Sequence, residues 1–374
     1  MPVQAISTIP VMRPQLPAAS ALLPYLERID QARYYSNSGP LLREFEGRLA
    51  SFYQVDERQL AVVANGTVAL SAALIAAGAK QGTKCLLPAW TFVGSAAAVW
   101  AANLTPHFID VSPQTWMLDP ADVRRRTDLH EVGAVMVVSA FGAPVDTRAW
   151  DAFTADTGIP VIIDGAASFE TVASVERARP GRSPIMISLH ATKVFGVGEG
   201  AIVISKDETF VHRLRQICNF GIWGSPEGQI LGYNGKLSEY HAAVGLAALD
   251  GWSERRTIIE RLTQTYRTEL SGFPGIGTVP TFGDGWISCY CNIIVEGNSS
   301  RIIDRLAYMG IETRRWWRDG VHEQSAYAHF PSDPLPVTEN LAKRVFGLPF
   351  FHDIELAHIK RIFVCLRSAL DAPA

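Results

Sequence analysis

The chain has 374 residues, of which 48% are hydrophobic and 19% charged, and its formal net charge is −3 at pH 7. A chain of this length can bury a large core and is expected to divide into two domains, and its composition is typical of a soluble globular protein. The charge balance, with no basic tail, gives no reason to expect nucleic acid as a partner. The longest apolar stretch, residues 93–104, is too short to cross a membrane.

The five cysteines are scattered along the chain, which favours reduced thiols. The N-terminus has no cationic region followed by an apolar core, as a secretion signal would have, so we predict a cytoplasmic protein. Cys289 and Cys291 alternate along a strand-like run, but no histidine pair or second cysteine pair completes a zinc set, so no metal site is expected.

Apolar, strand-like runs alternate with helical patterns over the first 205 residues. This alternation predicts a three-layer α/β/α sandwich with a mostly parallel sheet and with functional residues at the strand ends. The predicted strands are residues 60–64, 84–88, 105–110, 134–139, 160–164, 185–188 and 201–205, and the predicted helices include residues 68–77, 94–102 and 147–157.

The pattern changes in the last third of the chain. The Ala/Leu/Val-rich segment 238–250 predicts a buried or subunit-facing helix, which continues through Trp252 into a charged helix over 254–271. Short strands and helices follow. We therefore predict a large domain over residues 1–255 and a smaller C-terminal α+β domain over residues 256–374.

A candidate phosphate site precedes the first of these helices. Asn65, Gly66 and Thr67 open a segment that looks helical, and free N–H groups together with the helix dipole bind anions at such a point, where Thr67 adds a hydroxyl. The alternative interpretation is an ordinary Asn-Gly turn before a helix.

Asp164 ends an apolar run, Val161 to Ile163, that reads as a buried strand. The carboxyl ends of strands are where α/β sheets bind ligands. Pyridoxal phosphate (PLP) needs such an anion against its pyridine nitrogen, so that the ring stays protonated and acts as an electron sink. A turn or helix-capping aspartate is the alternative.

Lys193 lies between the apolar run 185–187 and a glycine-flanked turn. A lysine held half-buried there loses hydration, so we expect its pKa to fall and its neutral amine to become available for an imine with a carbonyl cofactor or substrate. A solvated surface lysine is the alternative. A phosphate site, a strand-end carboxylate and a lysine in this order favour a PLP site.

The order of these segments resembles the DegT/DnrJ/EryC1/StrS family, the PLP-dependent aminotransferases of fold type I (aspartate aminotransferase-like) that act on nucleotide-linked keto sugars. The resemblance covers nearly the whole chain, and its most specific parts are the lysine segment and the Gly-Tyr-Asn segment. The matching segments are Asn37-Ser38-Gly39-Pro40, Asn65-Gly66-Thr67-Val68-Ala69-Leu70, Pro88-Ala89-Trp90-Thr91-Phe92, Asp164-Gly165-Ala166, Ser188 to Gly200, Gly232 to Glu239 and Gly310-Ile311-Glu312-Thr313-Arg314.

The resemblance implies roles for particular residues around the cofactor. Lys193 would form the Schiff base and move the proton, and Asp164 would pair with the pyridine nitrogen. Phe92 would stack on the ring. The phosphate would be held by Gly66, Thr67 and Ser188, and by Asn234 of a neighbouring subunit, which makes a homodimer with shared active sites obligatory. Phe92 and Ser188 could instead be packing residues only.

It also implies a substrate side. Lys236 would lie near the carboxylate of the amino donor, and His190 belongs to a His-Ala-Thr-Lys tetrapeptide that we place among the substrate-binding residues. Arg314, Trp316 and His322 fall where relatives line the sugar-nucleotide pocket, so arginine would meet the diphosphate and tryptophan a sugar or base. A basic turn with partly buried tryptophans is the alternative.

One residue departs from the family pattern. Ala167 stands where the family commonly has Gln or His near the cofactor's phenolic oxygen or the sugar, and a methyl group cannot form that hydrogen bond. The branch of the family that aminates C4 of dTDP-4-keto-6-deoxyglucose is the one that the chain most resembles. The features shared with it are Ala167, the His-Ala-Thr-Lys tetrapeptide and the pair Trp316-Trp317.

We therefore predict a PLP-dependent aminotransferase of amino-sugar nucleotide biosynthesis, which moves the amino group of L-glutamate to that sugar. The alternatives are a C3-aminating enzyme, a PLP enzyme acting on a non-sugar cyclic ketone, and a non-catalytic, PLP-holding regulatory dimer.

Overall fold

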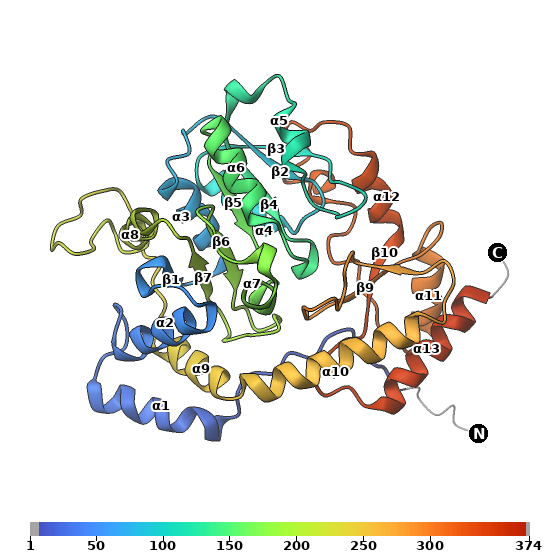
Figure 1. Cartoon of the computed structure of the whole chain (residues 1–374). Helices are drawn as coiled ribbons and strands as arrows, with labels where there is room; N and C mark the ends of the chain where they lie inside the picture. Colours follow the sequence, from blue (N-terminus) through green and yellow to red (C-terminus); the bar gives the residue numbers. More distant parts are fainter. Residues whose placement is uncertain (1–6, 372–374) are drawn as a thin grey trace.

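The computed structural model describes residues 7–371. Its centre is a seven-stranded sheet in the order β1-β7-β6-β5-β4-β2-β3, in which β7 alone runs antiparallel to its neighbours (Figure 1). The strands are β1 (Leu60–Val63), β2 (Lys84–Pro88), β3 (Thr105–Ile109), β4 (Val132–Val138), β5 (Val161–Asp164), β6 (Ile185–Ser188) and β7 (Ala201–Ile204). All seven predicted strands are confirmed, with ends that differ by one or two residues.

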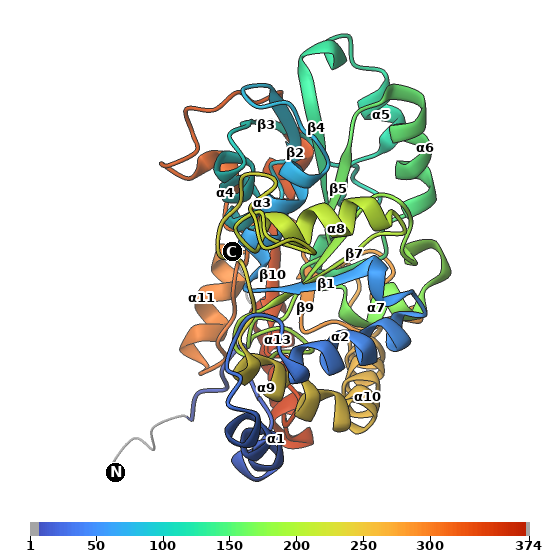
Figure 2. The ribbon, with the colours of Figure 1, turned by 90° about the vertical axis from the view of Figure 1, so that its left-hand side faces the viewer.

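Helices cover both faces of this sheet, which confirms the three-layer α/β/α architecture (Figure 2). Because both faces are covered, the central strands are continuous apolar runs rather than alternating ones. One face carries α3 (Gly66–Ala76), α4 (Val93–Ala101) and α8 (Glu208–Ile217); the other carries α2 (Pro40–Tyr53), α5 (Pro120–Arg124), α6 (Thr147–Thr157) and α7 (Phe169–Ser174).

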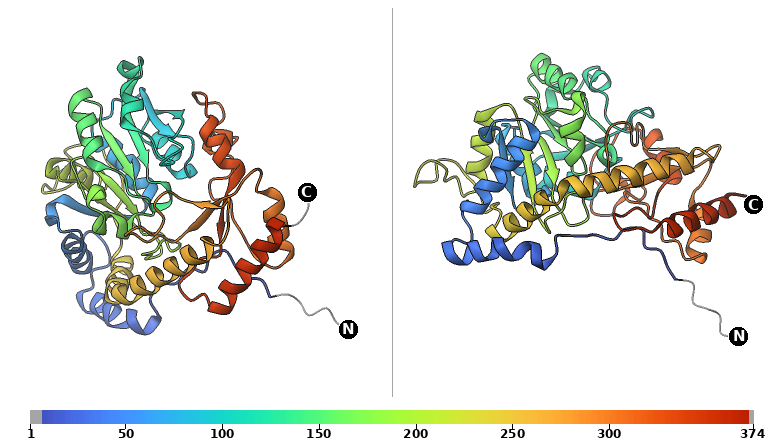
Figure 3. Two further views of the ribbon diagram at one scale, coloured as in Figure 1. Left: turned by 45° about the vertical axis from the view of Figure 1, so that its right-hand side comes forward. Right: turned by 60° about the horizontal axis from the view of Figure 1, so that its bottom comes forward.

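A second, three-stranded antiparallel sheet in the order β10-β9-β8 lies beside the first (Figures 1 and 3). Helix α10 (Trp252–Leu270) leads to it from α9 (Glu239–Asp250), which packs on α1 (Ala19–Ala32). The remaining elements are β8 (Gly277–Thr278), β9 (Cys291–Ile294), α11 (Ser300–Tyr308), α12 (Pro336–Arg344), β10 (Val345–Leu348) and α13 (Leu356–Asp371).

The expected domain boundary between residues 255 and 256 falls inside α10, so the division stays a prediction. Within residues 7–371, no helix combines the length and the apolar character that crossing a bilayer requires.

Candidate active site

The carboxyl ends of β5 and β6 lie side by side and bring Asp164 and Ser188 to the same edge of the sheet. Asp164 is 6% exposed and Ser188 is 8% exposed. The Ser95 hydroxyl donates a hydrogen bond to Asp164 Oδ2 at 2.7 Å, and the Ala166 N–H donates to Oδ1 at 3.1 Å. The Asp164 carboxyl group is therefore fixed in place from two sides.

Burial raises the pKa of the Asp164 carboxyl group, although the Ser95 hydroxyl, the Ala166 N–H and the Lys193 charge all act in the opposite direction. Removal from water penalises the anion, and a cation placed against the carboxylate would favour it again. The protonated pyridine nitrogen of PLP is such a cation, so this buried carboxyl group fits the expected cofactor.

The expected phosphate site is the first turn of α3. Asn65 caps this helix, because its Oδ1 accepts a hydrogen bond from the Val68 N–H at 3.0 Å. The N–H groups of Gly66 and Thr67 have no acceptor within the helix, because the first turn of a helix offers none, and they are available to bind an anion. A Cβ atom on Gly66 would stand 3.8 Å from Ser188 Cβ, so the helix start and the end of β6 face one another.

Phe92 presents an exposed aromatic ring beside this helix start. The residue precedes α4 and is 61% exposed. A Cβ atom on Gly94 would lie 3.2 Å from the Phe92 ring and 3.6 Å from Thr67 Oγ1, which places the ring and the hydroxyl around one glycine. An exposed, flat apolar face next to an anion site suits a phosphorylated ring.

Lys193 is half-buried in the turn between β6 and β7, and its Nζ donates a hydrogen bond to the Tyr290 hydroxyl at 3.0 Å. Burial lowers the pKa of the Lys193 ammonium group, but Tyr290, Cys289 and Asp164 raise it by more, so the pKa stands above the ordinary range of lysine. The expectation that this pKa falls was wrong, because the sequence did not reveal the groups that face the amine. The cofactor-free chain holds Lys193 as an ammonium ion at neutral pH.

Tyr290 was not among the predicted site residues. Its ring packs edge-on against Phe141 and Trp316, with centroids 5.8 and 4.8 Å away, and burial raises the pKa of its hydroxyl to about 12. The Cys-Tyr-Cys alternation predicted only reduced thiols on one strand face and no role for the tyrosine between them. Ser95 was missed as well, although it follows closely on the matched segment that ends at Phe92.

Tyr290 links the lysine to the predicted substrate residues. Beyond it lies Trp316, and the exposed Arg314 guanidinium sits 5.0 Å from the centroid of the Trp316 indole. His322 follows Val321, whose N–H donates to the Ala89 carbonyl at 2.9 Å, just past the end of β2. The His322 side chain is 10% exposed. Its Nε2 lies 3.4 Å from Glu323 Oε1, and Nδ1 has no hydrogen-bond partner among the described residues.

The His190 ring contacts its own loop. Its Nδ1 accepts from the Thr192 N–H at 3.2 Å and lies 2.8 Å from the Thr192 hydroxyl, while Nε2 is 3.6 Å from Glu199 Oε1. These contacts assign His190 to shaping the lysine turn; its predicted substrate contact stays a prediction.

Asn234 and Lys236 follow the projecting loop 221–232 (Figure 1). Asn234 is exposed. The Lys236 amine lies 4.4 Å from the centroid of the Phe220 ring, and burial lowers its pKa. Among the described residues, no contact is found between Lys193 and either Asn234 or Lys236, and the predicted role of Asn234 in a neighbouring subunit stays a prediction.

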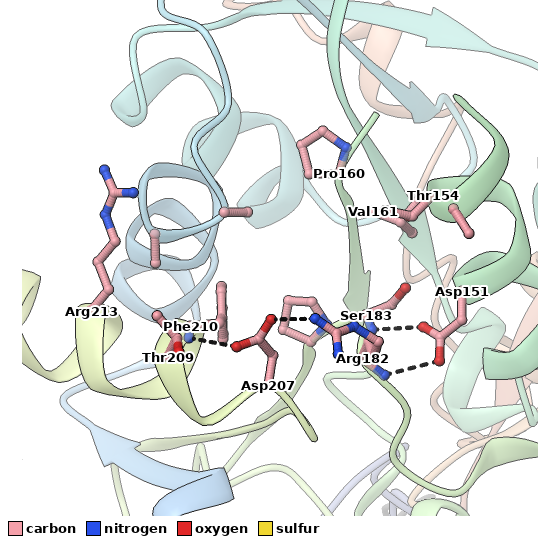
Figure 4. Close-up of a pocket in the computed structure, with 14 residues that line it drawn as sticks. Asp151, Thr154, Pro160, Val161, Arg182, Ser183, Asp207, Thr209, Phe210 and Arg213 are labelled. Carbon is pink, nitrogen blue, oxygen red and sulfur yellow. Dashed lines mark hydrogen bonds and ion pairs between the residues drawn. The ribbon is translucent and has the colours of Figure 1, made fainter. Parts of the chain in front are cut away.

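A separate hollow of about 360 Å³ lies at the other ends of β5 and β6, between α6 and α8 (Figure 4). Its charged groups include a paired set: Asp151 accepts from the N–H groups of Arg182 and Ser183, and the Arg182 side chain donates to Asp207 at 2.8 Å. This hollow contains none of the predicted site residues.

Comparison with known proteins identifies the class. A solved structure of a putative PLP-dependent aminotransferase from Bacillus cereus is 28% identical with a TM-score of 0.88, over 96% of this chain and 100% of that one. The structure of DesI in the presence of its TDP-sugar product is 29% identical with a TM-score of 0.86, over 98% and 94% of the two chains. The chain therefore has the fold of a PLP-dependent aminotransferase, as predicted.

The family model of the DegT/DnrJ/EryC1/StrS aminotransferase family matches residues 19–367, and the chain belongs to this family. A relative from Shigella dysenteriae, a dTDP-4-amino-4,6-dideoxy-D-glucose transaminase, is 29% identical over 96% of this chain and 98% of its own. The predicted enzyme class and its cofactor, PLP, are confirmed. The roles of individual residues are taken up below as proposals.

Proposed function

We propose that this protein transfers the amino group of L-glutamate to C4 of dTDP-4-keto-6-deoxyglucose. The observation that carries the proposal is the meeting of Asp164, Ser188 and the start of α3 at one sheet edge, with Lys193 beside them. The choice of a 4-keto sugar is supported by the Shigella relative, a dTDP-4-amino-4,6-dideoxy-D-glucose transaminase, and the choice of dTDP also by DesI with its TDP-sugar product.

When bound, PLP carries the amino group between the two substrates and draws electrons into its protonated ring. Asp164 would hold that ring proton. Gly66, Thr67 and Ser188 would bind the phosphate through backbone N–H and hydroxyl groups, and Phe92 would cover one ring face. Lys193, whose charge interacts with that of Asp164, would carry the proton between the reacting carbon atoms.

The substrate side is proposed from charge and unpaired polar groups. Arg314, exposed above the Trp316 indole, offers a forked donor to the diphosphate and a flat face to the base or sugar. The buried Nδ1 of His322 has no partner among the described residues, while Nε2 lies 3.4 Å from Glu323 Oε1. A buried nitrogen of this kind favours a ligand that supplies the missing hydrogen bond. Lys236 would meet the carboxylate of the amino donor.

We further propose a homodimer in which Asn234 completes the phosphate site of the partner subunit. The exposed position of Asn234 behind a projecting loop supports this arrangement. The experiment is to incubate the protein and PLP with L-glutamate and a panel of dTDP, UDP and GDP 3-keto and 4-keto sugars, and to identify the products by mass and NMR.

The proposal expects turnover on dTDP-4-keto-6-deoxyglucose with an amino group at C4. Turnover on a 3-keto sugar alone, or on a cyclic ketone that is not a sugar nucleotide, would replace it with one of the alternative substrates. Analytical ultracentrifugation measures the dimer in the same preparation.

A further inference from the structure

The hydroxyl group of Tyr290 accepts a hydrogen bond of 3.0 Å from Lys193 Nζ, and the Cys289 side chain is a second polar neighbour. The contact joins residues 97 positions apart, one in the turn between β6 and β7 and one just before β9. The Tyr290 ring packs against Phe141 and Trp316. A packed side chain, rather than a mobile one, therefore presents the hydroxyl group to the Lys193 amine.

Tyr290 and Ala167 approach one turn, Ala140–Gly142, through different residues of it. Ala167 is buried, and its carbonyl oxygen is 2.7 Å from the place of a Cβ on Gly142. Phe141, the residue before that glycine, packs against Tyr290. The Tyr290 ring therefore covers the same turn, Ala140–Gly142, on which Ala167 rests.

We propose that the Tyr290 hydroxyl is a catalytic group: it is the proton partner of Lys193, which it contacts at 3.0 Å. A phenol can both accept and donate a hydrogen bond. It accepts from the Lys193 ammonium group in the cofactor-free chain, and it donates to the nitrogen once that nitrogen has lost its proton. The lysine nitrogen thus keeps a hydrogen bond in both protonation states, and no charge has to be left unpaired in the buried site.

The inference rests on the proposed function for its meaning in turnover, but its first test needs no cofactor. Tyr290 raises the pKa of Lys193, whereas burial lowers it. Removing the hydroxyl group in Tyr290→Phe should therefore lower the pKa of Lys193 and make its neutral amine more abundant. Other charged or titratable groups that face Lys193 are kept in the variant. They are Asp164 and Cys289, with Arg255 and His352 lining the same small cavity.

The experiment measures how fast acetic anhydride labels Lys193 in the cofactor-free protein at pH 9, relative to the exposed Lys206, by peptide mass spectrometry. We expect labelling of Y290F to be about tenfold faster, the change that one pKa unit produces. The matched control is Tyr308→Phe, in which an 88% exposed tyrosine on α11 loses its hydroxyl; its Lys193 should be labelled at the wild-type rate. An unchanged or slower rate in Y290F overturns the inference.

A second readout uses the PLP-loaded enzyme. We expect Y290F to lower kcat by about 100-fold or more with KM nearly unchanged, since a positioned proton-transfer group contributes about 10²- to 10⁴-fold. An unchanged kcat also overturns the inference. Phenylalanine keeps the packing on Phe141 and Trp316, and if thermal unfolding shows that Y290F is not folded, Tyr290→His, which keeps a polar ring atom, must then restore wild-type labelling. Failure of PLP to attach to Lys193 would instead refute the proposed function and leave the labelling result standing.

Discussion

The two sides of the candidate site are built differently. On the side of the large sheet, Asp164 and Ser188 end adjacent strands, are buried, and have hydrogen-bond partners within the chain. On the side of the smaller sheet, Arg314 is exposed, and the buried Nδ1 of His322 lacks a partner among the described residues, while Nε2 lies 3.4 Å from Glu323 Oε1. The difference separates a preorganised cofactor side, in which polar groups are already satisfied, from a substrate side that leaves groups for a ligand.

The largest expected effect is on the cofactor side. Lys193→Ala should lower kcat by at least about a thousandfold, because the amine that carries the proton is removed. Steady-state assays of the amino transfer measure this, with the exposed Lys206→Ala as the control. A Lys193→Ala protein that keeps its biological activity would support the non-catalytic, regulatory alternative and contradict the comparison.

Asp164→Asn should lower kcat by about 100- to 1000-fold, the range found when one preorganised electrostatic group is removed. Asparagine has nearly the same shape, so the packing around β5 should be retained, and Asp156→Asn on the surface of α6 provides the matched control. Stopped-flow kinetics with glutamate alone would locate the loss in the first half of the reaction. If both variants react at the wild-type rate, Asp164 has no role at the ring.

A change on the substrate side should show a different kinetic signature. Arg314→Ala should raise KM for the nucleotide sugar by about 10- to 100-fold and leave kcat nearly unchanged, because a hydrogen bond from a charged group contributes about 1.5–3 kcal/mol to binding. KM for glutamate should not move. Arg177→Ala, an exposed arginine outside the site, is the control, and a loss confined to kcat would place Arg314 among the groups that act on the reacting atoms.

The smallest effect concerns stability and pH. Because burial raises the pKa of Asp164, the folded chain binds its proton more tightly than the unfolded chain does, so the stability contributed by this group is full below the ordinary aspartate pKa and is lost as pH rises through the folded value. Asp164→Asn should therefore make the cofactor-free protein more stable at pH 7 but not at pH 3.5. Urea unfolding at both pH values measures the difference; equal effects at the two pH values would show that the carboxyl group is not desolvated.

The cofactor side could be predicted from the sequence because its residues stand at the ends of apolar runs. The runs that end at Asp164 and Ser188 are buried strands, and the position of a strand end in a parallel sheet already implies where its side chain lies. Asn65 and Gly66 marked the start of a helix in the same way. Local pattern and sheet topology were sufficient for these residues.

The substrate side could not be predicted in this way. Tyr290 reaches Lys193 from a segment 97 residues away, and no periodicity in the sequence places the approach to β9 against the turn after β6. For the same reason the direction of the Lys193 pKa was predicted wrongly: burial was visible in the sequence, but the neighbouring Tyr290 and Cys289 were not. Contacts between the two sheets depend on tertiary packing.

The most direct test of the central claim is to reduce the PLP-loaded protein with borohydride, digest it, and locate the cofactor by peptide mass spectrometry. The account predicts one added pyridoxyl phosphate group per chain, on Lys193, and none in a Lys193→Ala sample treated identically. A protein that takes up the cofactor stoichiometrically but carries it on another lysine, or on none, would contradict it.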